Sequence, residues 1–237
     1  MANTTLSQRP NTASRTTVFL KLLMASSGAV FVLYVLLHMY GNLKVLSGEQ
    51  PFNEYAESLR TLLMPILPYA GLLWILRVVL IVAVLAHIYA AFKLWARANN
   101  ARPTRYAVAK AATAGLKSKM MRWGGVAILV FVVWHLLQFT IVKFNVNGDV
   151  DSAAVENNPY QLLYSSFEVW WVVLIYLIGM IALAMHLFHG VYSMAQTLSW
   201  TNTKRSHDTW KAIAIVIALV VGVGFIIPPL AIAFGAI

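Results

Sequence analysis

Five segments of this 237-residue chain are each long and apolar enough to cross a bilayer as a helix. They span about residues 19–43, 70–92, 123–144, 169–195 and 210–234. Period-two alternation is absent, so a transmembrane barrel is not expected. Charged residues make up only 11% of the chain, against about 25% in soluble domains. The sequence therefore predicts an all-α transmembrane protein, a five-helix bundle.

Basic residues gather in the segments that would share one side of the membrane. Of the 18 lysines and arginines, 14 lie near the N-terminus, in residues 93–122 or in residues 204–211, whereas seven of the eight acidic residues lie in or beside the other two loops. The positive-inside rule then predicts a cytoplasmic N-terminus and an external C-terminus. We divide the chain into an N-terminal cytoplasmic arm, residues 1–18, and a membrane domain, residues 19–237. Pro228 is expected to kink or end the last helix.

Four of the six histidines lie one each in the first four apolar segments: His38, His87, His135 and His186. Ionisable side chains inside a bilayer are costly and usually face the interior of a bundle. One such histidine is simply explained by a hydrogen bond to a carbonyl, but one on each of four consecutive helices indicates a shared site. The chain has no cysteine, which excludes thiolate metal sites, iron–sulfur clusters and covalently attached haem within it.

The depths of these histidines divide them into two pairs. Counted from the basic end at 1.5 Å per residue, His87 lies about 8 Å deep, His186 about 14 Å, His135 about 20 Å and His38 about 25 Å. Two imidazoles on opposite sides are the axial ligands of a six-coordinate b-type haem. A bare metal would need three or four ligands at one depth, and a proton relay would add mid-span carboxylates. The spacing predicts two haems b stacked inside helices one to four, with the fifth helix outside.

Other residues in the apolar segments have two interpretations. Arg77 either snorkels to the membrane interface or pairs with a propionate of the deep haem. Small residues at 25–28, Gly124, Gly125 and Gly179 either admit a flat cofactor or allow ordinary close packing of helices.

Seven motifs, in order along the chain, resemble one known family. They are KLLMASSG (Lys21–Gly28), HMYGNLK (His38–Lys44), FNEYAESLR (Phe52–Arg60), WILR (Trp74–Arg77), AHIYA (Ala86–Ala90), WHLLQFT (Trp134–Thr140) and HLFHGVYS (His186–Ser193). Together they resemble the cytochrome b membrane-anchor subunit of succinate dehydrogenase, in the single-chain, five-helix, di-haem type shared with some quinol:fumarate reductases. The resemblance covers about residues 20–200.

The resemblance implies that His38, His87, His135 and His186 bind two haems b, and that His189 is not needed as a ligand. It implies a chain of respiratory complex II in the cytoplasmic (inner) membrane, linking the tricarboxylic acid cycle to electron transport. The expected partners are a flavoprotein subunit carrying FAD and an iron–sulfur subunit, both on the cytoplasmic side. The chain would pass their electrons to quinone, typically menaquinone, without itself oxidising succinate. The basic residues Lys117, Lys119 and Arg122 are expected to dock the iron–sulfur subunit.

A quinone needs hydrogen-bond donors at its carbonyls and a proton source. Ser27 on the cytoplasmic side, and Glu57 and Arg60 on the outer side, are the candidates, and a second, distal haem favours the outer site. The simpler interpretation of acidic residues in loops such as Glu57 is that they form a solvent-exposed surface. Three alternatives remain: a haem-free quinone-binding anchor, the cytochrome b anchor of another respiratory dehydrogenase, and a transporter or channel without redox function.

Overall fold

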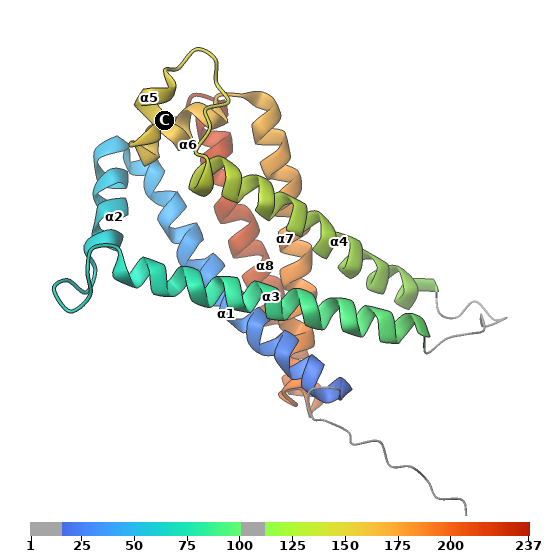
Figure 1. Cartoon of the computed structure of the whole chain (residues 1–237). Helices are drawn as coiled ribbons and strands as arrows, with labels where there is room; N and C mark the ends of the chain where they lie inside the picture. The colour runs from blue at the N-terminus through green and yellow to red at the C-terminus, as the bar shows by residue number, and fades with distance from the viewer. Residues whose placement is uncertain (1–15, 101–111) are drawn as a thin grey trace, which may run out of the picture.

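The computed structural model describes residues 16–100 and 112–237, and its regular elements there are all helical (Figure 1). Five helices have the length and composition to cross a membrane, so the chain is a multi-pass membrane protein with an all-α bundle. They are α1 (Thr17–Leu43), α3 (Gly71–Asn100), α4 (Ala112–Leu136), α7 (Trp170–Thr197) and α8 (Lys204–Ala233). Residues 1–15 of the expected N-terminal arm lie outside the described residues.

Short elements gather at the end of the bundle that also holds the C-terminus (Figure 1). They are η2 (Lys44–Ser47), α2 (Glu49–Thr61), the π-helical turn η3 (Leu137–Ile141), α5 (Ser152–Glu156) and α6 (Pro159–Phe167). We call this end of the bundle the capped end. We call the opposite end, at which α1 begins, the basic end. Only the five long helices were predicted from the sequence, because these elements are too short to cross a membrane.

The last long helix differs from its expected bounds for physical reasons. α8 begins at Lys204, six residues before the predicted start, because Thr203 and Ser206 form a reciprocal capping box there. Pro228 does not end the helix, as α8 continues through Pro228 and Pro229 to Ala233. A proline inside a membrane helix is tolerated because packed neighbours and local adjustment compensate for its missing N–H.

The bundle is assembled around α1 and α7. α7 packs along α8, α1 packs against α3, α7 and α8, and α4 packs against α7. Figure 1 shows α7 and α8 side by side, with α3 and α4 running obliquely across them. Small residues permit the α7–α8 contact: Ala214 and Ala218 are buried, and a Cβ added to Gly222 would lie 3.1 Å from the Cβ of Ala184. α8 therefore packs against both α1 and α7, and its Phe225 ring lies 5.7 Å from the ring of His38, so the fifth helix is not outside the histidine pairs as expected.

At the capped end, α2 and α6 are joined by a polar clasp centred on Asn158. The Asn158 side-chain oxygen accepts from the Gln161 N–H at 3.1 Å and from Asn53 Nδ2 at 2.9 Å, while its Nδ2 donates to Glu49 Oε1 at 2.6 Å. Asn158 thus caps α6 and binds α2 with one side chain.

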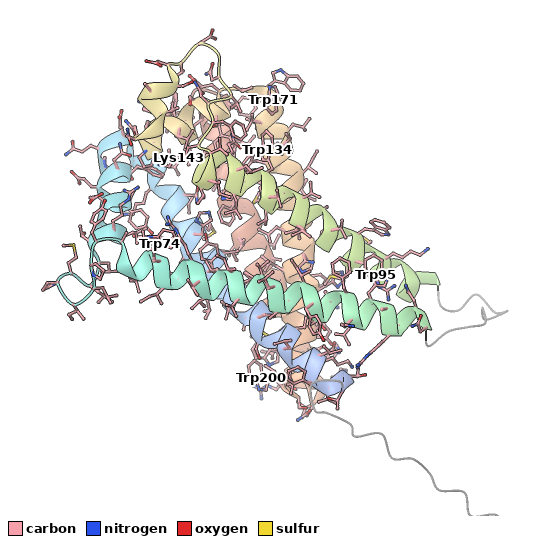
Figure 2. All side chains as sticks on the ribbon, in the orientation of Figure 1. Trp74, Trp95, Trp134, Lys143, Trp171 and Trp200 are labelled. Carbon is pink, nitrogen blue, oxygen red and sulfur yellow. The ribbon has the colours of Figure 1, made fainter. Side chains whose placement is uncertain are left out.

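Tryptophans mark both ends of the bundle (Figure 2). Trp134 and Trp171 lie towards the capped end, where their rings pack edge to face at 6.0 Å, and Trp200 lies at the opposite end, stacked on Trp210 at 5.0 Å. Tryptophan prefers the membrane–water interface because its ring is apolar and its N–H is polar. The two groups are consistent with a bilayer that crosses the molecule between them.

Candidate functional site

The four histidines of the apolar helices lie as two pairs inside the bundle. His38 of α1 faces His135 of α4 with ring centroids 5.8 Å apart, and His87 of α3 faces His186 of α7 at 6.2 Å. These are the deep and shallow pairs that counting along the helices separates. Within the described residues, no group of three or more histidine and acidic side chains is placed to hold a metal ion. The donor set is therefore two separate pairs of imidazoles.

Both pairs fit a haem iron bound between two histidines. A metal–imidazole bond of about 2 Å on each side, added to the radius of each ring, separates the centroids by roughly 6 Å. The observed separations of 5.8 and 6.2 Å match that value. All four histidines are partly exposed rather than fully buried. A haem ligated by two imidazoles is a chemistry that this donor set supports.

One ring of the shallow pair is oriented by a serine of the neighbouring helix. Ser27 in α1 is buried, and its hydroxyl donates to the Leu23 carbonyl at 2.7 Å, with the Met24 carbonyl at 3.2 Å. The same oxygen lies 3.1 Å from His87 Nδ1. Ser27 therefore links α1 to α3 at His87. Its contact is with Nδ1 of the His87 ring and not with Nε2.

One ring of the deep pair is oriented in the same manner by a tyrosine. The Tyr176 hydroxyl in α7 lies 3.2 Å from His135 Nδ1 and donates to Gln138 Oε1 at 3.0 Å. Gln138 is fully buried and belongs to η3, where α4 widens into a π-helical turn. Such turns are frequent at functional sites because they re-aim side chains. The Tyr176 hydroxyl thus contacts both His135 and Gln138.

The second ring of each pair has a different environment. His186 Nδ1 is buried and has no hydrogen-bond partner among the described residues. His38 is stacked on Tyr34 at 5.2 Å with an interplanar angle of 12°, and its Nε2 lies 3.4 Å from Asn42 Nδ2. Each pair therefore combines one ring held by a hydroxyl on another helix with one ring that lacks such a contact.

Of the small residues singled out in the sequence, two lie directly against the histidines. A Cβ added to Gly28 would lie 3.7 Å from His87 Cε1, and one added to Gly125 would lie 3.5 Å from His186 Cε1. Gly179 instead faces the ring of Phe131, so it serves close packing between α7 and α4. Gly28 and Gly125 therefore stay candidates for admitting a flat cofactor, whereas Gly179 provides close helix packing.

Arg77 is exposed near the start of α3, at the capped end. Its guanidinium lies over the Trp74 ring, 4.8 Å from the centroid. It has no acidic partner among the residues that the structure describes. An unpaired guanidinium on a membrane helix can still bind a carboxylate, since its planar donors match two oxygens.

The candidate quinone residues lie in two places. At the capped end, Glu57 accepts from Arg60 at 3.3 Å and from the Tyr69 hydroxyl at 3.1 Å. Ser27 lies on the other side of the bundle, since Gly41 of α1 is the residue that packs against Tyr55 of α2, and 14 residues of helix between Ser27 and Gly41 span about 21 Å. The structure therefore does not combine Ser27 with Glu57 and Arg60 in one site.

Tyr55 adds a hydrogen-bond donor to the same region of α2. Partial burial, together with Tyr40, raises the pKa of Tyr55, and Lys44 opposes that shift. Its hydroxyl consequently keeps its proton at neutral pH.

The basic end joins α3 to α4 through one arginine. Arg122 donates to Asn99 Oδ1 at 3.1 Å, and its guanidinium lies over the Trp95 ring at 5.4 Å. Lys119 is exposed. The side chain of Lys117 lies outside the described residues. Of the three predicted docking residues, Arg122 thus also has an internal structural contact.

Sequence reasoning missed Tyr176 and Gln138. Both are polar residues inside apolar segments, and Gln138 follows His135 by three positions, close to one helical turn. That spacing could have indicated that Gln138 lies on the same helix face as His135. Nothing in the sequence assigns Tyr176 to His135, because 41 residues separate them.

A family model described as the succinate dehydrogenase/fumarate reductase transmembrane subunit matches residues 96–225. The match is 130 of 237 residues, more than half of the chain. It includes His135 and His186 and begins after His38 and His87. No curated protein and no solved structure matches the chain.

Proposed function

This chain belongs to the succinate dehydrogenase/fumarate reductase transmembrane subunit family, and we propose that it is the di-haem cytochrome b type of that membrane anchor. In this role it holds a flavoprotein and an iron–sulfur subunit at the membrane and conveys their electrons to quinone. The observation that supports the proposal is the pairing of four histidines from four different helices, at ring separations of 5.8 and 6.2 Å.

Each pair of imidazoles would hold one haem b, His38 with His135 and His87 with His186. When bound, the haems would supply one-electron transfer along the length of the bundle, across the bilayer. The chain contributes the rest: the helices fix the separation within each pair, and apolar walls exclude water. Iron–sulfur clusters would belong to a partner subunit, since this chain has no cysteine to bind them. FAD is expected on the flavoprotein subunit from the family resemblance.

The charge distribution supports one orientation in the cytoplasmic membrane. In the sequence, 14 of the 18 basic residues lie near the N-terminus, in residues 93–122 or in residues 204–211, so the positive-inside rule places the basic end in the cytoplasm. The N-terminus is then cytoplasmic and the C-terminus external. A phosphatase fused after Ile237 should be active outside the cytoplasm, whereas one inserted in the loop at 199–203 should be inactive. The reverse pattern would contradict the orientation.

For quinone, the capped end is the better candidate. It combines a carboxylate, Glu57, with donors on Arg60, Tyr69 and Tyr55, all within or beside α2. The Ser27 hydroxyl, in contrast, already donates to the Leu23 carbonyl, and its oxygen lies against His87 Nδ1. Menaquinone remains the expected acceptor from the family resemblance. A Glu57→Gln change should slow quinone reduction while leaving haem content unchanged.

The test of the proposal is purification from native membranes. A pyridine haemochrome assay should give two haems b per chain, and a flavoprotein and an iron–sulfur protein should copurify. A complex with these partners but without iron would support a haem-free anchor instead. Haem with a different catalytic partner would indicate the anchor of another respiratory dehydrogenase.

Single histidine replacements test the pairing. Replacing His38 or His135 should remove only the deep haem, and replacing His87 or His186 should remove only the shallow one. A His189 replacement is the matched control, since it lies one helical turn after His186 on α7. Two low-spin haems in a His135 variant would show that the pairing is wrong.

A further inference from the structure

In each pair, one histidine is contacted by one hydroxyl group, and that hydroxyl already donates its hydrogen to another acceptor. The Ser27 hydrogen goes to the Leu23 carbonyl at 2.7 Å, the usual back-bond of a helical serine. The Tyr176 hydrogen goes to Gln138 Oε1 at 3.0 Å. A hydroxyl has one hydrogen and two lone pairs, so each oxygen can only accept from a third neighbour.

The third neighbour is Nδ1 of a histidine in both places. Ser27 Oγ lies 3.1 Å from His87 Nδ1, and Tyr176 Oη lies 3.2 Å from His135 Nδ1. For these contacts to be hydrogen bonds, Nδ1 must carry the proton. A neutral imidazole has one proton, so Nε2 then has a free lone pair.

We propose that Ser27 and Tyr176 are positioning residues that hold His87 and His135 in the Nδ1–H form, with Nε2 presented to an axial ligand position. This inference rests on the proposed haem function. Each pair then has one ring fixed by a hydroxyl relay. Among the described residues, His186 Nδ1 has no hydrogen-bond partner, and the His38 ring nitrogens have a hydrogen-bond contact with Asn42 but with no hydroxyl.

The relays also set how strongly each fixed imidazole donates electrons. An acceptor at Nδ1–H raises the basicity of the ligating nitrogen. A more basic ligand stabilises the ferric state, which lowers the midpoint potential. Removing the acceptor should raise the midpoint potential of the haem on that ring, and of that haem alone.

The chain offers close controls for both positions. Ser26 precedes Ser27 and makes the same back-bond, to the Leu22 carbonyl at 2.9 Å, without a histidine contact. Tyr192 shares α7 with Tyr176, and its hydroxyl accepts from Gln196 at 3.4 Å. Ser27→Thr retains a hydroxyl that can bond to the same carbonyl.

The experiment is a redox titration of the purified, haem-loaded complex, followed by optical spectra of both haems. Ser27→Ala should raise the potential of the shallow haem and Tyr176→Phe that of the deep haem. Ser26→Ala, Tyr192→Phe and Ser27→Thr should match the wild type. Loss of the shallow haem in Ser27→Ala but not in Ser27→Thr would also support the relay.

Unchanged potentials in both Ser27→Ala and Tyr176→Phe would overturn the inference while leaving the di-haem function intact. An equal shift of both haems in either variant would do the same, since it would indicate a general structural effect. A wild-type complex without haem would overturn the proposed function, and the relay with it.

Discussion

Gly179 of α7 lies against the ring of Phe131 in α4, and an added Cβ would come within 2.6 Å of Phe131 Cδ2. Phe131 in turn stacks on His135 at 6.1 Å with an interplanar angle of 26°. At the scale of single residues, the deep pair therefore depends on a position with no side chain. A methyl group there would push an aromatic ring towards a histidine.

Gly179→Ala should lower the free energy of unfolding by about 1–3 kcal/mol, the usual cost of overpacking a tight site. The deep haem should be disturbed and the shallow haem retained. Gly124→Ala is the control, because its Cβ would meet nothing within 4 Å and alanine favours a helix. Thermal unfolding and haem spectra of both variants provide the measurement. A Gly124→Ala variant less stable than Gly179→Ala would contradict this account.

Arg77→Leu should lower the midpoint potential of the deep haem, because a nearby positive charge favours the reduced form. The shallow haem should change little. Lys93→Leu, at the far end of the same helix α3, should not reproduce the shift in the deep haem. If the potentials of both haems are the same in the Arg77 variant as in the wild type, the contact with Trp74 is sufficient to explain the residue.

The position of a site residue could be predicted where spacing along a single helix determines it. Counting gave the depth of each histidine, and the rings at matching depths are the ones that lie together. Counting cannot give the rotation of one helix against another. For that reason Ser27 could be proposed only as a quinone residue, and neither its contact with His87 nor the role of Tyr176 was predictable.

At the scale of elements, the capped end is held by helices that are too short to cross a membrane. Asn158 supplies the N-cap of α6 and joins it to α2 through Asn53 and Glu49. α2 then connects directly to the start of α3, where Arg77 lies. The five long helices were predictable from apolar length, whereas this clasp was not, because it depends on polar side chains more than 100 residues apart.

Asn158→Ala should destabilise the capped end by about 1–3 kcal/mol, through the lost cap and the lost bonds to α2. Hydrogen exchange should quicken in α6 and α2 while α7 and α8 stay protected. Asn202→Ala serves as the control, since Asn202 is exposed and makes no hydrogen bond among the described residues. Uniformly faster exchange in all helices would show that the clasp is not a local unit.

At the scale of the whole molecule, the two ends differ in charge and in structure. Among the residues that the structure describes, one end carries most of the basic residues, and the other carries the short helices and most of the acids. A docking surface for a soluble partner would therefore lie at the basic end. Lys119 is the cleaner test of that surface than Arg122, because Arg122 also holds α3 to α4.

Lys119→Gln, alone or with Lys117→Gln, should reduce recovery of the iron–sulfur and flavoprotein subunits. Each exposed charge is worth up to about 1 kcal/mol, and the loss should be most visible in washes at raised salt. Lys44→Gln, at the capped end, should have no effect on copurification. Full recovery in the double variant would exclude this surface as the dock.

The distribution of histidines over the helices also sets an order for biogenesis. The deep pair joins α1 to α4, and the shallow pair joins α3 to α7. Yet the hydroxyl at His135 comes from Tyr176, also on α7. Since a chain emerges from the ribosome N-terminus first, both histidines of the deep pair are present once α4 has been made, whereas the shallow pair and the Tyr176 contact of the deep pair need α7. Insertion of the shallow haem would then have to wait for synthesis of α7.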